Sequence, residues 1–286
     1  MTLSEKNELA ASASTRGARS SAEGRRSILQ ASLAGLAAGL AGASSASAHA
    51  QRQGRTFVLI HGAWFGGWVW KDVAAGLRAA GHTVYAPSLT GVGDRRHLLR
   101  PGINLDTHTD DVVSLIEMED LDEIVLVGWS YGGMVIANVL ARIPQKIGAM
   151  VYLDAFVPER GRSLASYGNR TGRQDELFQQ ALEGRDIPVS AMQVMGITDQ
   201  AVIDHAMPRV GPQPIATFLQ ASKALEQRPN IPHAYVLAGG YPNPTFRPFH
   251  KMFRDQGLGE TYVLNTSHAT MLTDPKGTID VLLKVR

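Results

Sequence analysis

The sequence of 286 residues contains no cysteine. A disulfide framework, a thiolate nucleophile and a cysteine-ligated metal are therefore excluded. An excess of charge of one sign is also missing, because 28 lysines and arginines stand against 26 aspartates and glutamates, so no nucleic-acid-binding surface is indicated. Hydrophobic residues make up 44% and charged residues 19%, which is the composition of a globular protein and not of a disordered chain or a coiled coil.

The first fifty residues lack phenylalanine, tryptophan, tyrosine and proline, and alanine, serine and glycine dominate them. Such a segment cannot build a packed core. Arg25 and Arg26 precede a mildly apolar run over residues 28–43, and Ala46-Ser47-Ala48 and Ala48-His49-Ala50 have the small-x-small pattern that signal peptidase cleaves. We predict a signal peptide over residues 1–50, similar to the twin-arginine type.

Export to the periplasm or the medium follows from this prediction, and the alternative is an alanine-rich extension with chance arginines. The apolar run is too short and too rich in glycine and alanine for a permanent transmembrane helix. The mature protein, predicted to begin near residue 51, is therefore expected not to span a membrane.

The remaining chain alternates short apolar runs with amphipathic stretches. The runs do not alternate polar and apolar side chains, which is typical of parallel strands buried on both faces; they cover residues 57–60, 83–86, 124–127, 149–153, 234–237 and 261–264. Helical patterns lie between them, over residues 70–80, 106–119 with Asp106 as N-cap, and 131–143. Residues 51–286 are therefore predicted to form one α/β domain, an open and mostly parallel sheet with helices on both faces.

One stretch, residues 158–232, contains no strand pattern. It is too long for a simple crossover between two strands. Helical patterns punctuated by prolines occupy it, over residues 175–182, 199–207 and 215–227. We predict a helical cap inserted over one edge of the sheet.

The segment Gly128-Trp129-Ser130-Tyr131-Gly132 has the G-x-S-x-G pattern. The bare pattern is weak, but here it stands directly between a predicted strand and a predicted helix. A serine at that junction occupies a tight turn that exposes its hydroxyl at the carboxyl edge of the sheet, and the glycines leave room for the neighbouring elements. Ser130 is therefore predicted to be a nucleophile, the alternative being a turn without chemistry.

A serine hydroxyl needs a base to take its proton. Nine histidines are available, and His268 follows the predicted last strand at the same carboxyl edge as Ser130. The chain order, serine first and histidine last, is also the order expected for this architecture. His268 is the predicted base, and the alternative is a histidine of a surface loop.

The third group should be a carboxylate that orients the imidazole, usually placed in the loop after the penultimate strand. That loop, residues 238–243, contains no acid. Asp154 is the best substitute, because it ends the strand beside the nucleophile strand. The alternative for Asp154 is a structural cap, and Asp255 and Glu260 are further candidates that precede the last strand, at its opposite end.

Acyl transfer also needs donors for the developing oxyanion. A glycine-rich run, residues 61–68, follows the first strand, and we assign the oxyanion hole to the backbone amides of Ala63 and Tyr131. A substrate pocket is predicted from aromatic and cap residues, namely Trp64, Trp129, Phe178, Met192 and Met195.

Four segments carry a resemblance to a known family: residues 57–70 (FVLIHGAWFGGWVW), 89–94 (LTGVGD), 127–133 (VGWSYGG) and Ser267-His268. Together they resemble the α/β-hydrolase superfamily. Within it they are similar to small esterases near plant methylesterases and hydroxynitrile lyases, and to bacterial pyrethroid-type carboxylesterases. The resemblance implies a serine hydrolase that needs no cofactor. No cluster of metal-ligating residues is visible in the sequence either. It also implies an acid after the penultimate strand, where this sequence departs from the pattern.

The sequence is compatible with three functions. The first is a serine carboxylesterase that acts on a hydrophobic small-molecule ester through an acyl-enzyme. The second is a hydroxynitrile-lyase-like enzyme, which would use a lysine of the cap, and Lys223 is the only lysine in that stretch. The third is a non-catalytic small-molecule binding protein on the same fold. A serine and a histidine at matching strand ends favour the first two.

Overall fold

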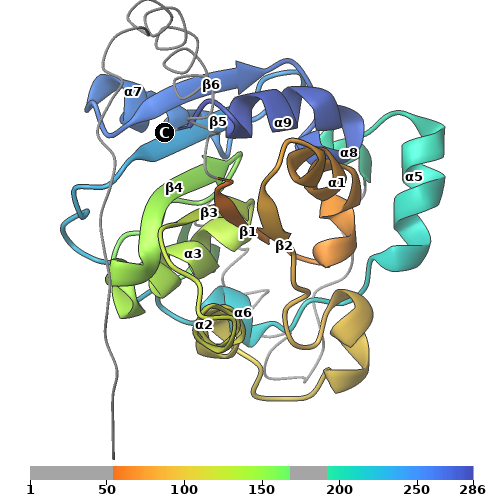
Figure 1. The fold of residues 1–286 in the computed structure, drawn as a ribbon. Helices are drawn as coiled ribbons and strands as arrows, with labels where there is room; N and C mark the ends of the chain where they lie inside the picture. Colours follow the sequence, from red (N-terminus) through yellow and green to blue (C-terminus); the bar gives the residue numbers. More distant parts are fainter. Residues whose placement is uncertain (1–53, 168–191, 286) are drawn as a thin grey trace, which may run out of the picture. The chain divides into compact units, whose positions relative to one another are not determined.

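The computed structural model describes residues 54–167 and 192–285. Six strands form one sheet in the order β2-β1-β3-β4-β5-β6, and every neighbouring pair is parallel (Figure 1). The strands are β1 (Thr56–Ile60), β2 (Thr83–Tyr85), β3 (Ile124–Trp129), β4 (Ile147–Leu153), β5 (His233–Ala238) and β6 (Glu260–Leu264). The predicted strands and the predicted α/β architecture are confirmed.

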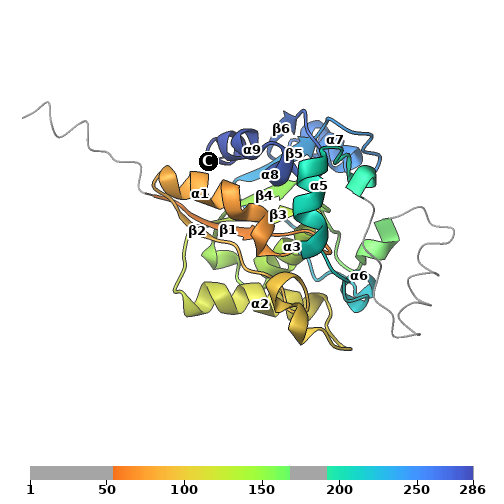
Figure 2. The ribbon, with the colours of Figure 1, turned by 90° about the vertical axis from the view of Figure 1, so that its right-hand side faces the viewer.

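Helices cover both faces of the sheet because successive strand side chains point to opposite sides. In β1, Val58 and Ile60 join the core under α2 (Leu105–Met118), α3 (Gly132–Arg142) and α7 (Arg247–Asp255). Phe57 and Leu59 join the core under α1 (Lys71–Ala79) and α9 (Pro275–Leu282). Figure 2 shows α1 and α9 on one side of the strands and α2 and α3 on the other.

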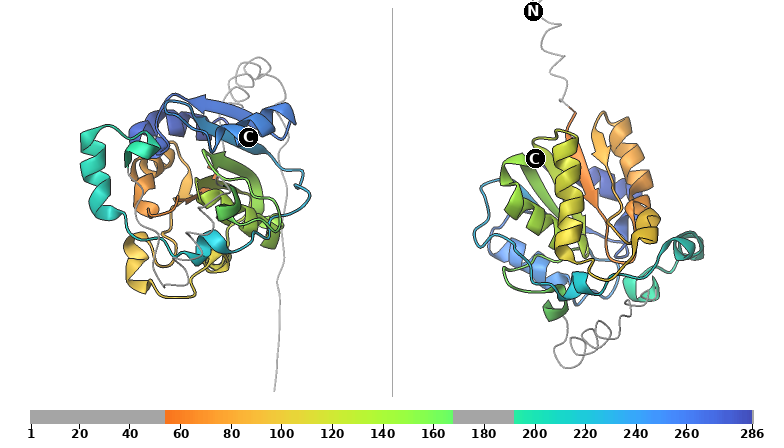
Figure 3. Two further views of the ribbon diagram at one scale, coloured as in Figure 1. Left: turned by 180° about the vertical axis from the view of Figure 1, so that it is seen from behind. Right: turned by 90° about the horizontal axis from the view of Figure 1, so that it is seen from below.

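Shorter helices lie mainly near the ends of the strands. They are α5 (Gln200–Ala206), α6 (Ala216–Leu219) and α8 (Thr270–Thr273), with 3₁₀ turns at Gly67–Trp70, Gly93–Leu98, Pro144–Lys146, Leu164–Tyr167, Met192–Met195 and Met207–Arg209. Figure 3 shows the segment with α5 and α6, in teal and cyan, at the carboxyl end of the strands. Of the expected cap helices, the one over 199–207 corresponds to α5, and the one over 175–182 lies outside the described residues.

The helix expected over residues 215–227 is wrong beyond Leu219, where α6 ends. The Ser222 hydroxyl and the Lys223 amide both donate to Asn138 Oδ1, at 2.8 and 2.9 Å, and Ala221 forms an isolated antiparallel bridge with Ser163. These contacts with α3 and with the chain after β4 hold the backbone extended, so tertiary bonding overrides the local helical pattern.

The N-cap predicted for α2 is also wrong. Asn104, not Asp106, caps this helix: its side chain accepts from the Thr107 amide, and the Thr107 hydroxyl accepts from the Asn104 amide. This reciprocal pair satisfies two amides that have no partner within the helix. Asp106 instead accepts from Gln220 and Lys223.

Among residues 54–167 and 192–285, no helix is both long enough and apolar enough to cross a membrane. The predicted signal peptide, residues 1–50, lies outside the described residues.

Candidate active site

Ser130 occupies the turn between β3 and α3. Its φ is 55°, in the left-handed region that a residue other than glycine rarely adopts, at a cost on the order of 1–3 kcal/mol. The turn is held because the Ser130 carbonyl accepts from the amides of Gly133 and Phe156, both at 3.1 Å. A Cβ on Gly132 would lie 2.7 Å from the Ile60 carbonyl oxygen, so only glycine allows α3 to start this close to β1.

The Ser130 side chain is partly exposed, and its hydroxyl forms no hydrogen bond to any residue that the structure describes. The amino end of α3 lies directly behind it. The partial positive charge of a helix amino end stabilises negative charge there. The turn thus presents a free hydroxyl in a place that favours an anion.

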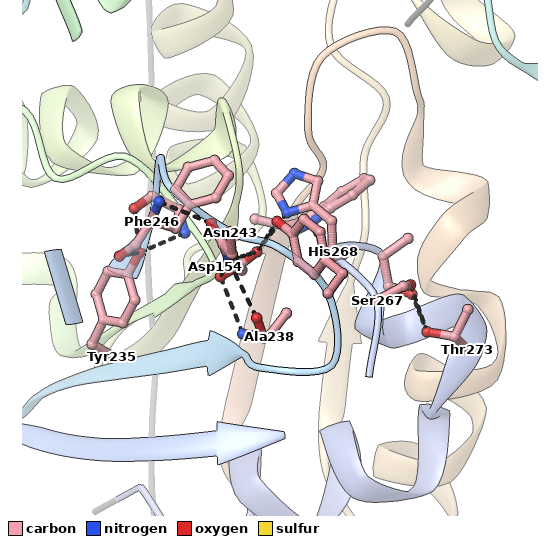
Figure 4. Close-up of polar contacts among 12 residues, drawn as sticks. Asp154, Tyr235, Ala238, Asn243, Phe246, Ser267, His268 and Thr273 are labelled. Atoms are coloured by element: carbon pink, nitrogen blue, oxygen red, sulfur yellow. Dashed lines mark hydrogen bonds and ion pairs between the residues drawn. The ribbon is translucent and has the colours of Figure 1, made fainter. Parts of the chain in front are cut away.

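His268 lies in the loop after β6, and its ring is almost fully buried. The ring Nδ1 lies 2.7 Å from Asp154 Oδ2 (Figure 4). A carboxylate can only accept, so Nδ1 carries the proton and Nε2 is the basic nitrogen. Within the described ranges Nε2 has no hydrogen-bond partner. This is the protonation pattern that a general base requires.

The backbone of His268 is tied to the nucleophile turn. The indole Nε1 of Trp129 donates to the His268 carbonyl at 2.8 Å, and the two rings lie 5.2 Å apart between centroids. Because Trp129 directly precedes Ser130, this contact ties the loop of His268 to the turn that carries Ser130. The His268 amide donates to the Met195 carbonyl at 2.9 Å, which fixes the other side of the loop.

Asp154 is fully buried, and its φ of 44° is again left-handed. Besides His268, its carboxylate accepts from the Ala238 amide at 3.1 Å, the Tyr241 hydroxyl at 2.9 Å and the Asn243 side-chain amide at 2.8 Å. The loop after β5 has no acid of its own, but the last residue of β5 and this loop together supply these three donors to the acid that follows β4. Burial and the charge of Asp154 raise the pKa of Tyr241, so this hydroxyl remains a donor.

The loop that carries Ala63 packs directly on the nucleophile turn, since a Cβ on Gly62 would lie 3.0 Å from the Cβ of Ser130. His61 fixes this loop: its Nδ1 donates to the Gly62 carbonyl at 2.7 Å, and its Nε2 accepts from the Leu89 amide at 3.1 Å. Burial lowers the pKa of His61 to about 4, which keeps the ring neutral for this arrangement.

The backbone amides of Ala63 and Tyr131 have no acceptor among the described residues, although both residues are buried. Buried amides without a partner are rare in folded proteins. Both belong to segments that meet at the Ser130 turn, so these two amides are candidates for binding a developing oxyanion.

The pattern of residues 57–281 matches a family model described as the alpha/beta hydrolase family. The chain belongs to this family. The resemblance seen in the four sequence segments is thereby confirmed. The α/β-hydrolase fold also accounts for the sheet order and for a serine turn after β3.

Relatives of this α/β-hydrolase include esterases. The carbendazim hydrolyzing esterase of Nocardioides sp. (strain SG-4G) is 38% identical over 238 residues, which cover 77% of this chain and 94% of the relative. Salicylic acid-binding protein 2 of Nicotiana tabacum is 37% identical over 136 residues, 46% of this chain and 52% of that protein. A solved extracellular α/β-hydrolase from a Paenibacillus species, 25% identical, superposes with a TM-score of 0.66 over 81% of this chain and 98% of its own. These similarities support a hydrolase activity.

The other acids considered from the sequence lie away from this α/β-hydrolase site. Asp255 at the end of α7 pairs with Lys251 and Arg254, and Glu260 accepts from the Tyr262 hydroxyl at the start of β6. The structure thus brings Asp154, and neither of these two, to His268.

The residues expected to line the substrate pocket differ in how far they are buried. Trp129, Met192 and Met195 are buried in the interior, with Trp129 packed against the ring of Phe65 at 5.0 Å. Trp129 and Met195 contact His268, and all three residues present little surface to a substrate. Trp64 is partly exposed. Phe178 lies outside the described residues.

Two residues of the α/β-hydrolase site were not predicted from the sequence, Asn243 and Phe246. The Asn243 side chain is almost fully buried; it donates to Asp154 and accepts from the Phe246 amide at 2.9 Å. The Phe246 ring stacks on His268, with 4.9 Å between ring centroids and 10° between ring planes (Figure 4). A sequence signal for Asn243 was available: the loop after β5 has no carboxylate, but it contains Tyr241 and Asn243, whose side chains can donate hydrogen bonds to an acid placed elsewhere.

In the described ranges, no three histidine, aspartate or glutamate side chains gather closely enough to hold a metal ion.

Proposed function

We propose that this α/β-hydrolase cleaves a small-to-medium hydrophobic carboxylic ester by serine-dependent catalysis through an acyl-enzyme. The observation that carries the proposal is the 2.7 Å contact between His268 Nδ1 and Asp154 Oδ2, which leaves Nε2 without a hydrogen-bond partner among the described residues. The names of the relatives support an ester substrate.

In the first half of the reaction Ser130 Oγ attacks the ester carbonyl carbon while His268 Nε2 takes the hydroxyl proton. The carbonyl oxygen becomes an oxyanion that accepts from the amides of Ala63 and Tyr131, and Asp154 stabilises the imidazolium. His268 then returns the proton to the leaving alcohol, and an acyl-Ser130 ester remains. Water repeats the sequence on the acyl-enzyme and releases the carboxylic acid.

The preference for a hydrophobic ester rests on the aromatic side chains next to the Ala63 loop. The Trp64 ring meets the Phe218 ring edge to face, with centroids 5.9 Å apart. Apolar rings beside an oxyanion site favour an apolar acyl or alcohol group, because its burial removes apolar surface from water.

A series of nitrophenyl esters of increasing acyl length tests the activity, and an organophosphonate probe followed by peptide mass spectrometry tests the nucleophile. We expect Ser130-dependent hydrolysis and a label on Ser130 that is absent in Ser130→Ala. A label on another serine, or full activity in Ser130→Ala, contradicts the proposal. Absence of both label and turnover favours the binding-protein alternative.

A cyanohydrin substrate separates the esterase from a lyase. The lysine that a lyase of this fold would use, Lys223, lies at the surface and pairs with Asp106 on α2 at 2.7 Å. We therefore expect ester hydrolysis without cyanide release. Cyanide release faster than ester hydrolysis would reverse the assignment.

We also propose that residues 1–50 direct export and are then removed. The support is the Arg25-Arg26 pair followed by an apolar run and small-x-small sites, together with the relative described as extracellular. Deletion of residues 1–50 should leave the activity of purified protein intact, and Arg25→Lys with Arg26→Lys should block export. Normal export of the lysine form points to the general secretory route, and retention of the wild type inside the cell contradicts export.

A further inference from the structure

The backbone of Trp64, directly after Ala63, is held in an unfavourable conformation by the segment that follows α5. Its φ is 69°, which a bulky aromatic residue rarely adopts. The Trp64 amide donates to Gln213 Oε1 at 3.0 Å, and the Trp64 carbonyl accepts from the Gly211 amide at 3.1 Å. A conformation of this kind persists only where its surroundings determine it. Gly211 and Gln213 therefore set the backbone next to the Ala63 amide.

Gln213 is itself fixed at both ends of its side-chain amide. The residue is fully buried, and its Nε2 donates to Thr217 Oγ1 at 2.9 Å. Thr217 Oγ1 in turn donates to the Pro214 carbonyl at 2.6 Å. With the oxygen bound to Trp64 and the nitrogen bound to α6, the Gln213 amide has one satisfied orientation.

The helix α6 also contacts the residue that supplies the second oxyanion amide, Tyr131. The Phe218 ring lies 5.7 Å from the Tyr131 ring and 5.9 Å from the Trp64 ring, between centroids. One short segment thus touches both loops of the oxyanion hole.

Tyr131 is held from the opposite side by α2. Its hydroxyl lies 2.9 Å from His108 Nδ1, and His108 Nε2 lies 2.8 Å from the Thr90 carbonyl. Because a carbonyl only accepts, Nε2 carries the proton and Nδ1 accepts from Tyr131. The side chain of Tyr131 is therefore clamped between α2 and α6.

We propose that Gln213 is a positioning residue which, with Thr217 and Phe218, fixes the separation between the amides of Ala63 and Tyr131. We name these three residues the cap clamp. The proposal rests on the proposed esterase function. It gives the segment around α6 a part in positioning the oxyanion amides, in addition to its place in the cap. An error of about 1 Å in such a position costs on the order of a hundredfold in rate.

The test is Gln213→Met, which keeps the length and the apolar stem of the side chain and removes both hydrogen bonds. We expect kcat per active site to fall about tenfold or more while KM changes less than about twofold, because the lost contacts act on the transition state. Binding of a boronic acid, which forms a tetrahedral adduct with Ser130 Oγ, should weaken by a factor similar to the loss in kcat. Active sites are counted with the organophosphonate probe.

Gln220→Met is the matched control. Gln220 also joins the end of α6 to the first turn of α2 by two hydrogen bonds, to the Asp106 amide at 3.0 Å and to its carboxylate at 2.7 Å, without a hydrogen bond to Trp64 or Tyr131. Its kcat per active site should stay within about twofold of the wild type. Gln213→Glu keeps an oxygen facing the Trp64 amide, so its kcat should lie closer to the wild type than that of Gln213→Met.

Unchanged kcat and boronate affinity in Gln213→Met overturn the proposal. So do equal losses in the two methionine variants, or a loss explained entirely by fewer active sites or a lower melting temperature. Wild type and Ser130→Ala are measured in parallel. If the wild type shows no Ser130-dependent hydrolysis, the proposed function itself has failed; if it does, a negative result concerns only the cap clamp.

Discussion

Two buried histidines of this protein, His268 and His108, differ in what their ring nitrogens meet. His268 gives Nδ1 to the Asp154 carboxylate and leaves Nε2 without a partner in the described chain. His108 uses both nitrogens, one on the Thr90 carbonyl and one on the Tyr131 hydroxyl. The first ring is arranged to take up a proton, and the second is arranged to hold its neighbours.

The difference teaches that burial of a histidine does not by itself indicate catalysis. A base needs an anion behind it, to stabilise the cation that forms, and an open nitrogen in front. His108 has a neutral partner at each nitrogen, and burial lowers its pKa to about 4, so it stays neutral while the reaction proceeds. Removing each ring should therefore have effects of different size and kind.

The largest effect is expected for His268→Ala, which should reduce kcat on the order of 10⁴-fold. Steady-state kinetics of Ser130→Ala, His268→Ala and the double variant provide the check. The double variant should be little worse than either single one, because the two side chains share one step. Losses that multiply would show that His268 does not activate Ser130.

Asp154→Asn should reduce kcat at least about a hundredfold, since an uncharged partner can present the wrong tautomer to the serine. It should also lower the melting temperature, because the new NH₂ group must face one of the donors around the carboxylate. Asp255→Asn, in an exposed ion pair on α7, is the control and should behave like the wild type. Near-normal kinetics in Asp154→Asn would assign the orienting role to another group.

His108→Gln should reduce kcat only about tenfold, because it loosens Tyr131 without removing a reacting group. The profile of kcat/KM against pH distinguishes the two histidines. Its acid limb should stay where it is in the wild type, since His108 does not titrate during the reaction. A shifted acid limb would show that His108 exchanges protons in the catalytic cycle.

The smallest effect is on stability in acid. Burial lowers the pKa of His61 and of His108 to about 4, whereas a histidine in the unfolded chain titrates near 6.5. Between these values the unfolded chain binds a proton that the folded chain does not, so the free energy of unfolding falls as the pH falls. The slope is at most about 1.4 kcal/mol per pH unit for each histidine.

Urea unfolding between pH 7 and pH 4 measures this slope. His108→Gln should flatten it, and His97→Gln, a change at an exposed side chain, should not. An equal slope in His108→Gln and the wild type would show that His108 is protonated in the folded state as well.

The strands could be predicted closely because their information is local. Each is a short run rich in apolar or β-branched residues, and β1, β3, β4 and β5 are almost fully buried on both faces. Each predicted strand agrees with the structure to within two residues. The end of the helix that begins after residue 215 could not be predicted, because the residues that follow it bind Asn138 on α3, which is distant in the sequence. The helices α7 to α9 were not assigned either. In α7 only Phe253 is buried, while Phe249 and Met252 pack against the core partly exposed.

The residues of the candidate site also divide into those that local sequence predicts and those that it does not. Ser130, His268 and Asp154 each follow a predicted strand, so the sheet topology alone brings them to one edge. Asn243 and Gln213 act through side-chain amides on groups far away in the sequence, and no local pattern marks them. His108 did carry a signal, a polar residue among the buried positions of α2.

The position of the acid after β4 also sets the order in which the site is assembled. Ser130 and Asp154 end adjacent strands joined through α3, so a short and inexpensive loop closure brings them together. The whole cap segment and β5 must be synthesised before β6 can add at the edge of the sheet and deliver His268. A growing chain on the ribosome thus brings Ser130 and Asp154 together early and lacks His268 until β6 has emerged. Under the proposed function, such a chain has no base to activate Ser130 and cleaves no ester until its synthesis is nearly complete.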